Sequence, residues 1–134
     1  MSGRPIVRFC EGGGEPDLVG DWIAGDGLAA ERAMLARLGA ALSNEEVQAP
    51  ETVRAAVARL PRGQVVLLPG TRQLVPGRPI VGATIRMQNL RLVQGVLANR
   101  TGQRSPTVRA RRRSSAFVPP DVALGMWLEF REER

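Results

Sequence analysis

The chain has 134 residues and a formal net charge of +6, and all 19 of its basic residues are arginines. It has no histidine, lysine or tyrosine, and its only cysteine is Cys10. These absences exclude histidine-dependent nucleophiles, lysine Schiff bases, lysine-dependent phosphate loops, disulfides within the chain and structural zinc sites. The composition therefore disfavours most enzymes, and we expect no catalytic residues, no cofactor and no metal ion.

The size of the chain fits one domain with a single core, since 43% of its residues are apolar. No apolar run approaches the roughly 20 residues of a membrane-spanning helix. Residues 1–8 lack the apolar region of a secretory signal. We therefore expect a protein of the cytoplasm or of a virion, with 1–25 as an extended N-terminal arm and 26–134 as a single domain.

Two helices are predicted first along the chain. Asp26 is suited to cap a helix over about 26–42. The residues that share one face of this helix are Leu28, Met34, Leu35, Leu38, Ala41 and Leu42. A second helix is predicted over about 50–60, where Pro61 ends it. Its apolar stripe consists of Val53, Ala56, Val57 and Leu60.

Short apolar runs separated by Pro-Gly turns follow Gly63 and predict strands. These strands are expected at 64–68, 71–75 and 79–83. Residues 84–98 fit either a helix or two strands around Asn89. Because Gly95 weakens a helix by about 1 kcal/mol relative to alanine, we favour strands there.

The closing segment has the clearest pattern, because large apolar residues alternate with smaller or polar ones and so predict a strand. The apolar row is Val122, Leu124, Met126, Leu128 and Phe130. The predicted class is α+β, with the helix pair followed by a mainly antiparallel sheet or small barrel over about 64–131. We detect no internal repeat.

Charge is strongly segregated along the chain. Residues 1–51 carry nine acids and four arginines, 52–120 carry 13 arginines and no acid, and 121–134 carry four acids and two arginines. The acidic ends cannot neutralise the whole basic region. Its surplus must therefore meet solvent ions, an acidic partner or phosphates.

A cluster of arginines is the candidate site for binding a polyanion or an acidic partner. If 107–117 is one strand, Arg109, Arg111 and Arg113 share a face at a spacing of about 6.6 Å, near the phosphate step of a nucleic acid. The full set is Arg100, Arg104, Arg109, Arg111, Arg112 and Arg113. Few aromatic residues interleave with them, which weakens the nucleic-acid interpretation. A solvated strand edge is the alternative.

The two tryptophans, Trp22 and Trp127, are candidate interface residues. Trp127 alternates to the face opposite the apolar row of the last strand. It is therefore either an outward anchor or part of a sheet buried on both faces. The acid pairs Glu45-Glu46 and Asp17/Asp21 are interpreted as capping and helix-dipole charges rather than catalytic groups.

These features favour a non-enzymatic structural protein of a large particle, most simply a tailed-phage virion component of the capsid, neck or tail. Its acid-free region, 52–120, would contact acidic surfaces of other particle proteins, and a homo-oligomer is expected. We expect no membrane and no small-molecule substrate. The alternative is a nucleic-acid-binding protein without sequence preference that uses the row from Arg100 to Arg113. An enzyme built only from Asp, Glu, Ser, Thr and Arg has the least support.

Overall fold

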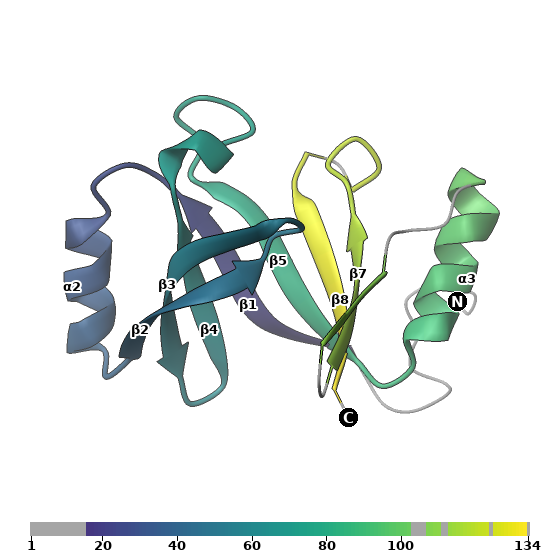
Figure 1. Ribbon diagram of the computed structural model, residues 1–134, viewed down its shortest axis with the longest axis horizontal. Helices are drawn as coiled ribbons and strands as arrows, with labels where there is room; N and C mark the ends of the chain where they lie inside the picture. Colours follow the sequence, from purple (N-terminus) through teal and green to yellow (C-terminus); the bar gives the residue numbers. More distant parts are fainter. Residues whose placement is uncertain (1–15, 103–106, 111–112, 124, 134) are drawn as a thin grey trace, which may run out of the picture. The chain divides into compact units, whose positions relative to one another are not determined.

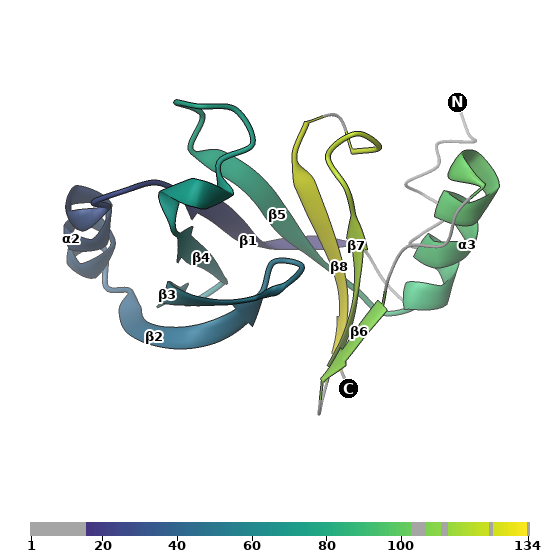
Figure 2. The same cartoon turned by 45° about the horizontal axis from the view of Figure 1, so that its top comes forward.

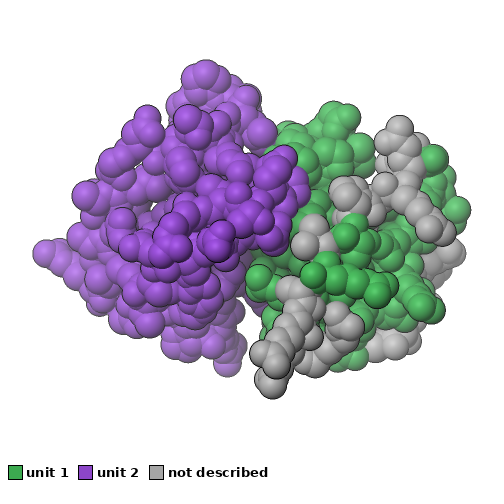
Figure 3. Space-filling view, viewed as in Figure 1, with its two compact units in different colours: residues 1–18, 84–134 green, residues 19–83 purple. Residues whose placement is uncertain are grey.

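The computed structural model describes residues 16–102, 107–110, 113–123 and 125–133. The chain divides into two compact units, shown in Figure 3. Unit 1 consists of residues 1–18 and 84–134, and unit 2 consists of residues 19–83.

The order of elements is a strand, a helix and three strands, and this order occurs twice (Figure 1). The first set is β1 (Asp17–Ala24), α2 (Ala29–Arg37), β2 (Ala41–Gln48), β3 (Thr52–Leu60) and β4 (Gly63–Leu68), followed by a 3-10 turn at Gly70–Arg72. The second set is β5 (Ile80–Met87), α3 (Leu90–Thr101), β6 (Thr107–Ala110), β7 (Arg113–Val118) and β8 (Trp127–Glu133). The chain is therefore a repeat of two βαβββ modules.

The two modules also order their strands alike. The order is β2-β3-β4-β1 in the first module and β6-β7-β8-β5 in the second. The pairs β2–β3, β3–β4, β6–β7 and β7–β8 are antiparallel, whereas β1 pairs with β4 in parallel. A parallel pair requires a crossover connection, which α2, β2 and β3 supply in the first module.

In unit 2, α2 covers one face of the sheet. Its one buried side chain, Leu35, packs on Ala58 and Leu67 within a cluster that the strands dominate. The opposite face is apolar too, since Trp22 is 2% exposed and Val57 is 1% exposed. The sheet of this unit is thus buried on both faces.

In unit 1, α3 covers one face of the sheet (Figure 2). Leu90 and Val93 of α3 pack there against Ala116 and Phe130. Glu132 of β8 accepts a hydrogen bond from the backbone N of Leu90 at 2.7 Å, which fixes the start of the helix to the last strand.

The predicted fold class is wrong, because no N-terminal helix pair precedes the sheet. The first helix exists but ends at Arg37, where Gly39 follows with a φ of +89°. Asp26 does not cap it, since Leu28 is the N-cap residue and no side chain accepts a hydrogen bond there. Residues 41–48 and 52–60 are strands instead of helix.

The second predicted helix, over about 50–60, is wrong, because these residues form β3 and both faces of β3 are buried. Ala55 to Ala58 are four consecutive buried residues, so the alternation that reveals a half-buried strand is absent. A continuous apolar run fits a helical stripe equally well. The sequence pattern was ambiguous, and the neighbouring strands decided the outcome.

The preference for strands over 84–98 is also wrong beyond Met87. Asn89 caps α3 by accepting a hydrogen bond from the backbone N of Arg91, and Gly102 ends the helix with a φ of +71°. Burial of Leu90 and Val93 outweighs the cost of Gly95, because each fully buried side chain contributes about 1.5–3 kcal/mol.

The remaining strand predictions had mixed outcomes. Those over 64–68 and 79–83 correspond to β4 and the first part of β5, whereas 71–75 forms no strand. The last strand begins only at Trp127, because the backbone of Val122 turns back to bond Pro119. Of the predicted arm, residues 1–15 lie outside the described residues, and Asp17–Ala24 form β1.

Two glycines offer a matched test of this packing. A Cβ at Gly63 would lie 2.8 Å from the backbone O of Val19, whereas a Cβ at Gly95 would meet no atom within 4 Å. We expect Gly63→Ala to lower the free energy of unfolding by about 1–3 kcal/mol, because the backbone of β1 cannot yield. Gly95→Ala should raise it by about 0.4–1 kcal/mol. Urea denaturation of both variants measures the difference, and equal effects would contradict the close approach of β1 to β4.

Candidate functional site

The face of unit 1 opposite α3 carries a row of polar and charged residues. Leu128 and Phe130 of β8 pack in the cluster beneath α3. Side chains alternate along a strand, so Glu129 and Arg131 lie on the other face. Phe117 is directly opposite Glu129 in the register of β7 and β8.

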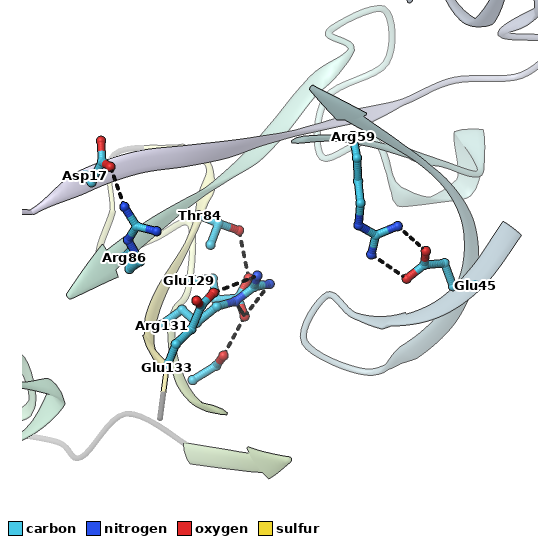
Figure 4. A network of polar contacts seen from close by, with 9 residues as sticks. Asp17, Glu45, Arg59, Thr84, Arg86, Glu129, Arg131 and Glu133 are labelled. Carbon is cyan, nitrogen blue, oxygen red and sulfur yellow. Dashed lines mark hydrogen bonds and ion pairs between the residues drawn. The ribbon is translucent and has the colours of Figure 1, made fainter. Parts of the chain in front are cut away.

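Glu129 is the centre of this row. Its side chain is 3% exposed, and hydroxyl groups from two other strands orient its carboxylate. Thr84 Oγ1 of β5 donates to Oε1 at 2.7 Å (Figure 4). Ser115 Oγ of β7 donates to Oε2 at 2.5 Å. The two hydroxyls hold the carboxylate in one orientation.

Arg131 supplies the opposite charge. Its Nη2 lies 3.2 Å from Glu129 Oε1, and its Nε lies 3.4 Å from Oε2. These contacts are longer than those of the hydroxyls. Nη1 lies 4.0 Å from Glu133 Oε1, beyond hydrogen-bond length. The Arg131 side chain is 11% exposed, and Nη1 is not among the atoms that bond Glu129.

The exclusion of water around Glu129 strengthens its hydrogen bonds and its ion pair with Arg131. Phe117 is fully buried beside Glu129, and the described buried polar side chains all have hydrogen-bond partners. Charges attract more strongly where water is excluded. Glu129, Arg131, Ser115 and Thr84, which we call the Glu129 cluster, thus form a buried polar group in which both oxygens of the carboxylate are hydrogen-bonded.

Other acids singled out by the sequence form ion pairs at more exposed positions. Glu45 of β2 pairs with Arg59 of β3, and this hydrogen bond raises the pKa of Arg59 (Figure 4). Asp17 pairs with Arg86 at 2.8 Å. Among the described residues, no group of three or more His, Cys, Asp or Glu side chains is placed to hold a metal ion.

The Glu129 cluster itself does not fit a metal centre. Glu129 is its only carboxylate, and hydrogen-bond donors from Thr84, Ser115 and Arg131 surround both of its oxygens. A divalent cation would have to sit beside the guanidinium cation, which repels it. Arg131, the only cation of the cluster, suits an anionic ligand group instead.

The predicted arginine row does not run along one strand. β6 ends at Ala110 and β7 begins at Arg113, so a hairpin separates Arg109 from Arg113. In its register Arg109 faces Ser114 and Arg113 faces Ala110, which places the two arginines on opposite faces. The remaining members are Arg100, exposed in the last turn of α3, and Arg104, Arg111 and Arg112, which lie outside the described residues. Binding of a polyanion or partner by these arginines stays a prediction.

The two tryptophans differ in environment. Trp22 is buried in unit 2, whereas Trp127 is half-buried and shares the face of Glu129 on β8. Their role at an interface stays a prediction.

Sequence reasoning missed all four members of the Glu129 cluster. A signal did exist, because Glu129 and Arg131 occupy alternate positions of the best-predicted strand, opposite its apolar row.

Comparison with known proteins identifies the fold. No family model matches the sequence, and no curated protein matches it. Among solved structures, methylmalonyl-CoA epimerase from Mycobacterium tuberculosis is 22% identical with a TM-score of 0.64, covering 87% of each chain. A hypothetical protein from Bacillus halodurans is 18% identical with a TM-score of 0.60, covering 89% of this chain and 95% of that one. A glyoxalase I variant from Zea mays is 15% identical with a TM-score of 0.57, and the match covers 87% of this chain and 42% of that one.

These likenesses define the fold, which the chain shares with a methylmalonyl-CoA epimerase and a glyoxalase I. The expectation of a non-enzymatic phage virion protein, with particle proteins as partners and no small-molecule substrate, is contradicted by these enzyme neighbours and is wrong. The absence of histidine and lysine excludes particular catalytic mechanisms, and it carried too much weight against an enzyme built from the remaining residue types. No helix among the described residues is long and apolar enough to cross a membrane.

Proposed function

We propose that the protein is an enzyme acting on a small molecule with a carbonyl or carboxylate group, with Glu129 and Arg131 as its reacting centre. One observation carries this proposal. A carboxylate that is 3% exposed is oriented by two hydroxyls and an arginine on the sheet face opposite α3. Burying such groups costs free energy, so an apolar core alone does not explain them.

Arg131 binds the substrate oxygen. Its Nη1 makes no hydrogen bond to Glu133 at 4.0 Å, and its contacts to Glu129 are long. A guanidinium group presents paired N–H donors that match a carboxylate or an enolate oxygen. Negative charge that develops on the substrate oxygen is stabilised there.

Glu129 accepts a proton from the carbon next to the carbonyl group. The C–H bond breaks, its electron pair forms the C=C bond of an enolate, and the carbonyl oxygen takes the negative charge beside Arg131. Return of the proton from Glu129 to the same face of that carbon restores the substrate, whereas the epimer forms when a proton from solvent adds to the opposite face of the enolate. No oxidant, reductant or metal is needed for this proton transfer.

Thr84 and Ser115 position the base. Their hydroxyls reach the carboxylate from β5 and β7, so its orientation does not depend on the bound substrate. Such preorganisation is what proton transfer requires. The structural neighbours support this chemistry, since one of them is an epimerase in complex with methylmalonyl-CoA.

Deuterium exchange tests the proposal. Compounds with an acidic hydrogen next to a carbonyl, beginning with methylmalonyl-CoA, are incubated with the protein in D₂O. Loss of the C–H signal is followed by proton NMR. We expect exchange faster than in buffer, and Glu129→Gln should slow it by about 100-fold or more because the base is removed.

Glu46→Gln is the matched control, since it makes the same chemical change at an exposed residue of β2. It should leave exchange unchanged. Exchange that persists in Glu129→Gln, or no exchange of any compound above buffer, would contradict the proposed function.

A further inference from the structure

Unit 2 contains a pocket on the α2 side of its sheet, with a volume of about 420 Å³. Arg32 of α2, Asn44 of β2 and Arg54 of β3 provide its polar lining. Its apolar lining includes Ala56 and Leu67, which belong to the buried cluster beneath α2. Every lining residue lies in unit 2, so this pocket is separate from the Glu129 cluster.

The pocket has a positive lining. Arg32 and Arg54 make no ion pair among the described residues, and no acidic side chain lines the pocket. Glu46 is opposite Arg54 in the β2–β3 register but is not part of the lining. The nearby Asp26 carboxylate lies against Gly70, so close that a Cβ there would clash with Oδ1. Arg32 and Arg54 are both exposed and are therefore accessible to an anion.

Apolar side chains beside Arg32 and Arg54 determine which kind of anion fits the pocket. Leu28, Ala56, Leu67 and Pro69 border the pocket and offer contact to a hydrocarbon chain. Its volume is within the range of small-molecule sites, in which a few polar groups orient a mostly apolar ligand. An inorganic anion would bind the two arginines but would make no apolar contact with the rest of the lining.

We propose that this pocket binds a carboxylate with an apolar tail. The carboxylate head lies between Arg32 and Arg54, with Asn44 as a further donor, and the tail lies on Ala56 and Leu67. The proposal goes beyond the enzymatic function and does not depend on it.

Isothermal titration calorimetry of the full chain with decanoate tests the proposal. We expect saturable binding of one decanoate per chain. Acetate, which lacks the tail, and decan-1-ol, which lacks the charge, should each bind at least about tenfold more weakly. The double variant Arg32→Gln/Arg54→Gln should lose at least about tenfold in decanoate affinity, because both charged hydrogen-bond donors are removed.

Arg62→Gln is the matched control, because it removes an exposed arginine that does not line the pocket. It should bind decanoate as the wild type does, and circular dichroism should show all variants folded.

The changes in amide NMR chemical shift on titration with decanoate should be largest at Gly27 and Leu28. Equal binding of decan-1-ol, unchanged affinity in the double variant, or no saturable binding would each overturn the proposal. Glu129→Gln should retain decanoate binding, so failure here is distinguishable from failure of the enzymatic proposal.

Discussion

Replacing Arg131 by alanine is expected to lower the free energy of unfolding by about 3 kcal/mol. The Glu129 carboxylate is 3% exposed and would lose its counter-charge, while the hydroxyls of Thr84 and Ser115 would still donate to it. An ionised carboxylate left without a cation in an apolar site is costly. Urea denaturation at pH 7, with the slope compared between variants, measures the loss.

Two variants control this experiment. Arg62→Ala removes an exposed arginine and should change stability by no more than about 0.5 kcal/mol. Glu129→Gln/Arg131→Met removes both charges and should recover most of the loss, because a neutral pair of similar volume avoids the buried charge. A loss below about 1 kcal/mol in Arg131→Ala would show that the pair is solvated.

Phe117→Ala is expected to cost about 3–5 kcal/mol of stability. Phe117 is fully buried and is among the largest buried side chains of the described residues. Its removal leaves a cavity that the β7–β8 pair cannot close, because the antiparallel register holds both strands at their spacing. The midpoint of thermal unfolding should fall accordingly.

Val122→Ala provides the comparison for Phe117→Ala, since Val122 is 40% exposed in the turn before β8. Its stability should change by about 0.5 kcal/mol or less. A similar small effect for Phe117→Ala would contradict the burial of its ring beside Glu129.

The fold was predictable where apolar and polar residues alternate along a strand. Both faces of β8 are buried from Glu129 to Arg131, but only the face beneath α3 is apolar, so the sequence pattern revealed this strand. In β3 both buried faces are apolar, and Ala55 to Ala58 therefore gave no alternation. The repeat of βαβββ modules could not be detected in the sequence. The two modules share the order of their elements and strands but not their residues.

The roles of two possible helix-capping residues, Asn89 and Asp26, were also predicted incorrectly. Asn89 caps α3, yet it was interpreted as a turn between two strands. Asp26 looked like a cap, but its carboxylate lies against Gly70 and the helix begins three residues later. A cap side chain indicates a helix start only when the following residues bury a face, as Leu90 and Val93 do.

The candidate site could not be predicted from the sequence because its members come from three strands. Thr84, Ser115 and Glu129 are far apart along the chain, and only the order β5-β8-β7 brings them together. None of the three residue types is rare or carries a recognisable motif. The absence of histidine and lysine excluded particular mechanisms, but it did not exclude a carboxylate and a guanidinium group acting together.

The binding of 2-nitronate-propionyl-CoA, a ligand of an epimerase with this fold, tests the central claim most directly. Its nitronate group carries negative charge on oxygen, as an enolate does. We predict that the wild type binds it at least about 100-fold more tightly than methylmalonyl-CoA. In Glu129→Gln/Arg131→Met, which should remain folded, that preference should disappear. Equal affinity for the two compounds in the wild type, or a preference that survives in the double variant, would contradict an active site at Glu129 and Arg131.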